Sequence, residues 1–245
     1  MNILNDLLKS FNEDAVVRSI LVGAHWTVVC SRHWGMAATL LDNFPHGHSQ
    51  VRDAGYLHTK SALELAEYAH SDTLMEASIG MATINSLLTV DESNAVEVNA
   101  VELLIEHGRG MNVALVGHFP FIPKLHPVVG RLWVIERHPA EGEYPAESAA
   151  DLIPKADVVA ITSSALINHT LDELLSLCRP EALVMMLGPS TPLSPVLFNH
   201  GVSILSGSRV VNEFAVLRTV SQGATFQQVE GVRLVALRRD KWNSR

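Results

Sequence analysis

The apolar positions near the start of the chain change from helical spacing to strand spacing. The first eleven residues carry apolar side chains three to four positions apart, which predicts an amphipathic helix. The stretch 16–30 is rich in Val, Ile and Trp with Gly23 in its middle, which predicts two strands or one bent strand, and 34–41 predicts a third. We therefore expect a short antiparallel meander.

Helix signals follow this meander. Ser61 with Glu64, and Thr73 with Glu76, have the spacing of capping boxes and predict helices that run to residue 70 and to residue 88. Asn85 lies inside the second helix as a candidate buried polar residue. Strands followed by helices predict an α+β arrangement for residues 1–93.

From residue 94 the pattern changes to alternating strands and helices. Asn94 can cap a helix that runs to His107, and Asn212 can cap another that ends at Gly223. Short apolar runs predict buried strands at 112–117, 132–136, 157–162, 183–187, 202–206 and 232–237. This alternation predicts the α/β class, with a parallel, doubly wound sheet over residues 94–245.

The segment 183–201 organises this second part. It predicts a buried strand, a rigid polar loop from Gly188 that offers Ser190 and Thr191, and a short helix capped by Ser194 and closed at Gly201. We expect the loops after the first and fourth strands, 117–120 and 188–191, to meet at the switch point of the sheet, where such folds bind ligands, with loop 162–169 to one side. The alternative is a tight turn that prolines stabilise.

These loops offer hydrogen-bonding groups, namely the His118 imidazole, several hydroxyls and the Asn168 amide. A G-x-S-x-G elbow and a G-x-G-x-x-G phosphate loop are both missing from the sequence, so NAD is not expected, although Glu136 lies about 20 residues after Gly117, where a ribose-binding acid belongs.

The chain has 12 histidines, and none has a specific ligand spacing. His118 and Glu136 are the best candidates for a metal site, and His46 with His48 resembles a surface chelating pair.

Composition narrows the function further. The net charge of −8 argues against nucleic-acid binding, because a phosphate backbone requires a basic face. The two cysteines lie in apolar segments and predict core thiols in a reducing compartment. Apolar runs are too short for a membrane span, and the acidic start does not suit a signal peptide. We expect a soluble cytoplasmic protein.

Several short motifs resemble a known family. Gly117-His-Phe-Pro120, Glu136-Arg-His-Pro139, the 162–170 segment and Gly188-Pro-Ser-Thr-Pro-Leu193 look like the family described as "putative heavy-metal chelation". Gly35-Met-Ala37 and Gly80–Asn85 are similar to the domain that precedes it, whose fold is like the N-terminal domain of enolase. One departure is His169, where the family pattern suggests lysine.

The resemblance implies an enolase-N-terminal-like domain (1–93), a Rossmann-like domain (94–245) and a site in the cleft between them. Enolase chemistry does not follow, since the catalytic barrel is missing. His118 would be a metal ligand or general base, and Glu136 a ligand or acid, for a divalent metal ion. The implied cleft residues are Asn85, His118, Phe119, Pro120, Glu136, Thr162, Asn168, Gly188, Ser190 and Thr191.

Three hypotheses for function remain open. The first is a protein that binds a metal ion or a small molecule that carries one. The second is an enzyme acting on a small metabolite at the same cleft, in the synthesis of a chelator or cofactor. The third is a structural or regulatory partner protein. In each case we expect neither nucleic acid nor membrane as a partner, and we expect a homodimer.

Overall fold

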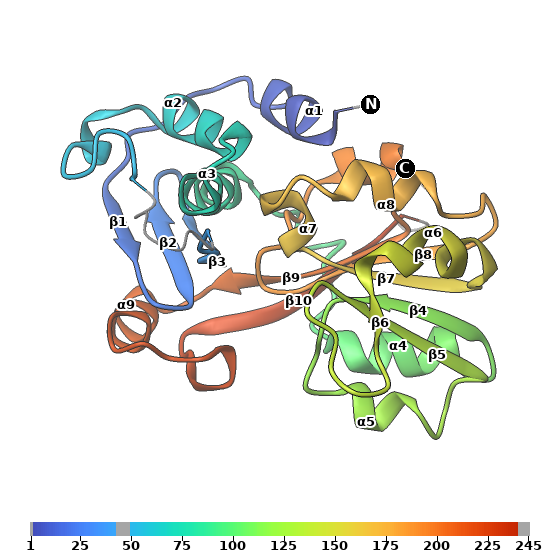
Figure 1. Cartoon of the computed structure of the whole chain (residues 1–245). Coiled ribbons are helices and arrows are strands. Elements are labelled where there is room, and N and C mark those ends of the chain that lie inside the picture. The colour runs from blue at the N-terminus through green and yellow to red at the C-terminus, as the bar shows by residue number, and fades with distance from the viewer. Residues whose placement is uncertain (1, 43–49, 240–245) are drawn as a thin grey trace.

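The computed structural model describes residues 2–42 and 50–239, and within them it contains two β-sheets (Figure 1). The first sheet has three strands in the order β1-β2-β3, and the second has seven in the order β10-β9-β8-β7-β4-β5-β6. The predicted α/β class is confirmed: a small antiparallel sheet with helices precedes a mostly parallel seven-stranded sheet with helices.

The front sheet is the predicted meander. Its strands are β1 (Ser19–Val22), β2 (Trp26–Cys30) and β3 (Trp34–Ala38), and both neighbouring pairs are antiparallel. The helical segments around it are α1 (Ile3–Lys9), η1 (Leu57–Thr59), α2 (Ala62–Ala66), η2 (Glu67–His70) and α3 (Leu74–Leu87). Helix α3 packs directly on β3 at Gly35, where an added Cβ would lie 2.2 Å from Ala82 O and from Ser86 N. Only glycine permits this approach.

The helix starts agree with the sequence only in part. The capping box of Ser61 and Glu64 is confirmed at α2, and Asn212 caps α9 (Glu213–Ser221) as expected. At α3 the box is wrong, because the Thr73 side chain makes no cap hydrogen bond and Glu76 bonds to other partners. Helix α4 (Ala100–Gly108) begins after Asn99 rather than Asn94, since Val96 is held extended by a bridge to Ala236.

The second sheet has helices on both faces. Along β4, Val113 and Leu115 face α4 and α5, while Ala114 faces the opposite cluster of buried side chains, as strand geometry requires. Its strands are β4 (Asn112–Val116), β5 (Arg131–Glu136), β6 (Tyr144–Pro145), β7 (Val158–Thr162), β8 (Leu183–Leu187), β9 (Ile204–Val210) and β10 (Val232–Arg238). The remaining helical segments are α5 (Ile122–Leu125), η3 (Ala146–Ser148), α6 (Ala149–Leu152), η4 (Ile153–Lys155), α7 (Ser164–Ile167), α8 (Leu171–Ser176), η5 (Pro195–His200) and η6 (Phe226–Gln228).

Two features of this sheet differ from the prediction. Strands β4 to β9 pair in parallel, but β10 is antiparallel to β9, because the α9 connection does not cross the sheet. The sheet order also places β7 between β4 and β8, so the loops after the first and fourth strands are not neighbours. The third strand, rather than the fourth, pairs with the first, and loop 162–169 lies between the other two loops.

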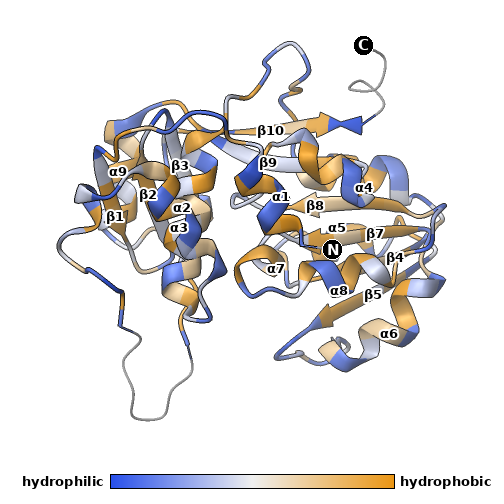
Figure 2. Cartoon of the chain, turned by 90° about the horizontal axis from the view of Figure 1, so that it is seen from above, coloured by the Kyte–Doolittle hydropathy of each residue, from blue (hydrophilic) through white to orange (hydrophobic). Residues whose placement is uncertain are grey.

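Helix α9 belongs to the second part of the chain but packs on the front sheet. Figures 1 and 2 both show it beside β1 and β2, at the far end of the β9–β10 ribbon. Val216 and Val220 of α9 are buried with Val28 and Met36 of the front sheet. Another buried cluster runs through both parts, from Ile3 to Leu237. A division near residue 93 stays a prediction, and the two parts are packed through shared cores.

Among the described residues, none of the helices combines the length and the apolar character that crossing a lipid bilayer requires.

Candidate functional site

The loop after β8 is the joint between the two sheets. Gly188 has φ +121° and an added Cβ would lie 2.7 Å from Ser163 Oγ, so this turn requires glycine. The following helix is confirmed at η5, with Ser194 as its N-cap and Gly201 in the left-handed conformation, although it is a 3-10 helix.

Ser190 connects this loop to the front sheet. It is 1% exposed, and its hydroxyl accepts a hydrogen bond from the backbone N–H of Ala38 at 2.7 Å. The amide nitrogen of Asn85 donates to Ser190 O at 3.0 Å and to Met36 O at 2.9 Å. Helix α3, strand β3 and the loop after β8 therefore meet at one point, which joins two of the predicted site residues, Asn85 and Ser190.

A cavity of ≈ 460 Å³ lies beside this joint, between the front sheet and β9. Its volume is within the range of small-molecule sites. Of the predicted residues, Asn85 and Thr191 line it, and the other lining groups that matter chemically are Arg18, Arg32, His33, Glu92, Ser208 and Arg209.

Two residues that line the cavity each have a buried polar atom that makes no hydrogen bond to any described residue. These atoms are Asn85 Oδ1 and Thr191 Oγ1, and the whole Thr191 residue is only 2% exposed. Because both amide hydrogens of Asn85 are engaged by carbonyl oxygens, the orientation of its amide is determined and Oδ1 can only accept. A buried polar atom without a partner costs about 1–3 kcal/mol, so such atoms mark a place where a ligand can add stability.

The cavity is electropositive. Burial lowers the pKa of His33, and the charges of Arg209, Arg32 and Arg18, in that order, lower it further. His33 Nε2 lies 3.1 Å from Thr89 Oγ1. Glu92 is the acidic group on the wall, and its hydrogen bond from Arg209, at 2.5 Å, lowers the pKa of its carboxyl. This local positive charge contrasts with the net charge of −8 of the whole chain.

The predicted metal ligands lie elsewhere, at the ends of β4 and β5. His118 Nδ1 is 2.7 Å from Glu143 Oε1, and the backbone N–H of His118 donates to Glu136 Oε2 at 2.9 Å. The N–H of Ala140 and the His118 ring lower the pKa of Glu143. Phe119 stacks on Phe121, with ring centroids 5.0 Å apart. Neither His118 nor Glu136 lines the cavity.

Strand spacing explains this separation. Strand β8 is three strand positions from β5 in the sheet. With about 4.8 Å between neighbouring strands, the ends of β8 and β5 are about 14 Å apart. The structure therefore divides the predicted residues into two groups. One lies at the joint beside the cavity (Asn85, Gly188, Ser190 and Thr191), and Asn85 and Thr191 line the cavity itself. The other lies at β4 and β5 (His118, Phe119, Pro120 and Glu136).

Thr162 and Asn168 lie on the loop between these groups. Asn168 Oδ1 accepts hydrogen bonds from Thr170 N at 3.3 Å and from Thr170 Oγ1 at 2.7 Å, at the start of α8. The next residue, His169, has φ +61° and its Nε2 is 2.9 Å from Ser71 O of the front part. These contacts fix the loop and connect it to the front part.

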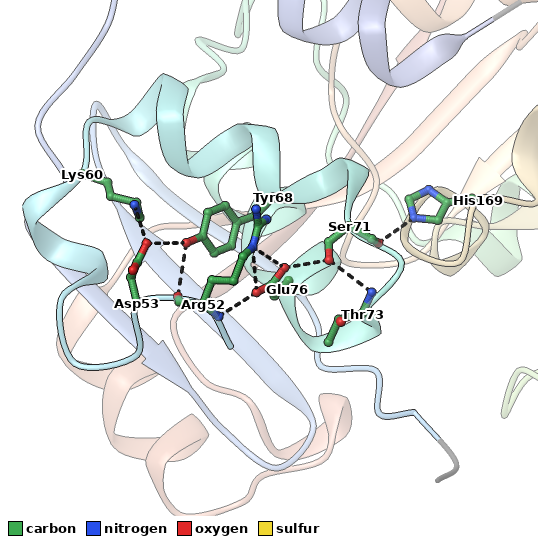
Figure 3. Close-up of polar contacts among 8 residues, drawn as sticks. All are labelled: Arg52, Asp53, Lys60, Tyr68, Ser71, Thr73, Glu76 and His169. Atoms are coloured by element: carbon green, nitrogen blue, oxygen red, sulfur yellow. Dashed lines mark hydrogen bonds and ion pairs between the residues drawn. The ribbon is translucent and has the colours of Figure 1, made fainter. Parts of the chain in front are cut away.

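A buried carboxylate near this contact is Glu76, shown in Figure 3. It accepts hydrogen bonds from Arg52 N at 2.6 Å, from Arg52 Nε at 3.0 Å and from Ser71 Oγ at 2.7 Å. Burial alone would raise the pKa of Glu76, but the hydrogen bonds from Ser71 and Arg52 lower it below its usual value. Because its acceptors are engaged by the chain itself, Glu76 has a structural role.

The described residues do not fit a metal ion held by the protein alone. Within residues 2–42 and 50–239, no three His, Cys, Asp or Glu side chains form a group that could hold a metal. A zinc centre requires three or four protein ligands, whereas the Glu136 carboxylate is directed at the backbone N–H groups of His118 and Arg137. His46 and His48 lie outside the described residues.

Sequence reasoning missed the arginines of the cavity. Arg18 precedes β1, Arg32 lies in the turn between β2 and β3, and Arg209 lies on β9. They form no sequence motif. The pairing of β1 with β2 brings Arg18 near the turn that holds Arg32, and the packing of β9 beside β3 adds Arg209. Arg32-His33 between two short predicted strands was the one local hint, since both must lie at the sheet edge.

The comparisons with known proteins agree with the fold. A family model described as "Putative heavy-metal chelation" matches residues 99–238, and a second model with the same description matches residues 4–88. An uncharacterised protein from Methanocaldococcus jannaschii is 27% identical over 193 residues, which are 73% of this chain and 70% of that protein.

Two solved structures are similar over almost the whole chain. A protein of unknown function from Desulfitobacterium hafniense has a TM-score of 0.86 and 27% identity, and the match covers 97% of this chain and 98% of that chain. One from Pyrococcus horikoshii has a TM-score of 0.81 and 21% identity with the same coverage, and it supports the fold alone. Both come from the family of the model that matches residues 99–238. The chain therefore belongs to the family described as "Putative heavy-metal chelation".

Proposed function

We propose that this protein binds a small molecule in the cavity between its two sheets, and that it handles metal through that molecule, as a chelator or a chelator–metal complex. The observation that carries this proposal is that two residues lining the cavity, Asn85 and Thr191, each have a buried polar atom without a hydrogen-bond partner, Oδ1 and Oγ1 respectively. A ligand that bonds to both atoms would remove their desolvation cost.

The family description supports the link to metal, and the donor set argues for an indirect one. The cavity offers guanidinium, hydroxyl and amide groups, which bind an organic ligand rather than a bare cation. The site residues in this proposal are Asn85 and Thr191, and Gly188 and Ser190 hold the loop that carries Thr191. His118 and Glu136 would then belong to a separate place on the surface.

Native mass spectrometry of untagged protein, with elemental analysis of the same sample, tests the proposal. We expect an adduct of small-molecule mass that Thr191→Val weakens, and any metal present should leave with the adduct. Thr59→Val is the matched control, because the Thr59 hydroxyl donates to Tyr56 O in an exposed turn away from the cavity. Stoichiometric metal that survives Thr191→Val but is lost in His118→Ala would contradict the proposal and favour direct binding at the end of β4.

The homodimer and the cytoplasmic location remain predictions. Light scattering over a range of protein concentrations tests the first, and a constant monomer mass would contradict it. The enzyme hypothesis concerns the same cavity, and release of a chemically changed adduct from the purified protein would support it.

A further inference from the structure

We propose, on the basis of the cavity site above, that its ligand is an organic polyanion that also carries a hydroxyl or N–H group. The anionic groups are carboxylates or phosphoryl groups, which Arg18, Arg32 and Arg209 hold, and the donor group bonds to Asn85 Oδ1.

The three guanidinium groups converge from separate elements. Each lines the same cavity, and each contributes to the positive field at His33. Like charges at one place repel, so the concentration of three arginines at a cavity favours an anionic ligand there. Guanidinium groups match carboxylate and phosphoryl oxygens with two parallel hydrogen bonds, which gives geometric specificity.

Two of these arginines pair with exposed glutamates. Arg209 pairs with Glu92, whose side chain is 77% exposed. Arg32 donates a hydrogen bond to Glu13 O at 3.0 Å and lies 3.6 Å from the Glu13 carboxylate, whose side chain is 82% exposed. Arg18 Nη2 donates to a neutral acceptor, Ser31 O, at 2.6 Å. Exposed glutamates can turn into water at little cost, so a ligand anion can displace them while each guanidinium still has donors to offer.

The uncharged wall of the cavity adds a second requirement. Asn85 Oδ1 can only accept, since Met36 O and Ser190 O engage the amide nitrogen. A ligand made only of carboxylate oxygens would leave this atom unpartnered. The Thr191 hydroxyl can donate or accept and therefore suits either part of the ligand.

Isothermal titration calorimetry at low ionic strength tests this inference with three probes. Citrate carries three carboxylates and a hydroxyl, tricarballylate carries the carboxylates alone, and inorganic phosphate represents the phosphoryl class. We expect citrate or phosphate to bind, and citrate to bind at least about tenfold more tightly than tricarballylate, because one hydrogen bond to a buried acceptor is at stake. Citrate binding without phosphate binding would assign the carboxylate class, and the reverse would assign the phosphoryl class.

Charge variants make the test specific. Arg209→Gln should weaken binding of the probe at least about tenfold, since a charge-assisted pair is lost. Arg218→Gln is the matched control, because Arg218 pairs with Glu230 outside the cavity, and it should leave affinity unchanged. Glu92→Gln should tighten binding, because it removes the group that competes for Arg209.

Negative results distinguish a failure of the polyanion inference from a failure of the proposed ligand site. Equal affinities in Arg209→Gln and Arg218→Gln, or no binding of any probe, would overturn the polyanion inference. If the adduct from the native mass spectrum still depends on Thr191 in that case, the cavity remains the ligand site and its ligand is not a polyanion. If binding depends on neither Thr191 nor Arg209, both proposals fail.

Discussion

Thr191→Val should stabilise the protein in the absence of ligand. The Thr191 residue is 2% exposed and its hydroxyl has no hydrogen-bond partner among the described residues. Valine has nearly the same shape and replaces that hydroxyl with a methyl group. An unpartnered buried hydroxyl costs about 1–3 kcal/mol. We therefore expect the free energy of unfolding to rise by about 1 kcal/mol.

Differential scanning calorimetry measures this change. For a chain of this size, about 1 kcal/mol corresponds to a Tm shift of about 2–4 °C. Thr27→Val is the matched comparison, because Thr27 is 0% exposed and its hydroxyl is 2.9 Å from Thr39 Oγ1. It should lower the Tm by a similar amount, since it breaks that hydrogen bond.

The sign of the Thr191 effect decides whether the reasoning holds. If both variants lower the Tm equally, the Thr191 hydroxyl has a partner within the protein and no longer indicates a ligand. If Thr191→Val raises the Tm and also lowers the affinity for the bound small molecule, threonine at this position lowers stability and favours binding, as functional residues commonly do.

Three other predictions follow from the same contacts. Arg209→Gln should raise the pKa of His33 toward its ordinary value of 6.5, which an NMR titration of the imidazole measures, and an unchanged pKa would contradict the proposed field. Glu76→Gln should remove stability that the wild type has above pH 4.5 and loses as the pH falls through the lowered pKa of Glu76; denaturation curves should therefore differ at pH 7 and converge in acid. Gly80→Ala should lower the Tm although alanine favours helices by about 1 kcal/mol, because its Cβ would lie 2.0 Å from Ala69 N; a higher Tm would show that α3 can move away.

Local signals in the sequence predicted local structure well. Three predicted features lie where their residues indicated: the meander of the front sheet, the capping box at Ser61, and the short helix between Ser194 and Gly201. Each depends on side chains a few residues apart. Thr73 was misleading because Glu76, three residues later, bonds instead to Arg52, a partner that its spacing cannot reveal.

The order of the strands could not be derived in this way. Each apolar run in the second part is equally able to pair with several others, and β7 takes the position beside β4 that the prediction had associated with β8. The error carried over to the site, since His118 and Ser190 were expected to meet and are held apart by that strand. The cluster of cavity arginines could not be predicted from the sequence either, because Arg209 joins it through the packing of β9 beside β3.

The position of α9 affects how the chain acquires its structure during synthesis. The face of the front sheet that carries Val28 and Met36 is covered by residues such as Val216, which are made long after the sheet itself. At about 5–20 residues per second, the interval between the two is roughly 10–40 seconds. For that time this face of the front sheet is exposed without its cover, so the front part should become resistant to proteases only after α9 has been made.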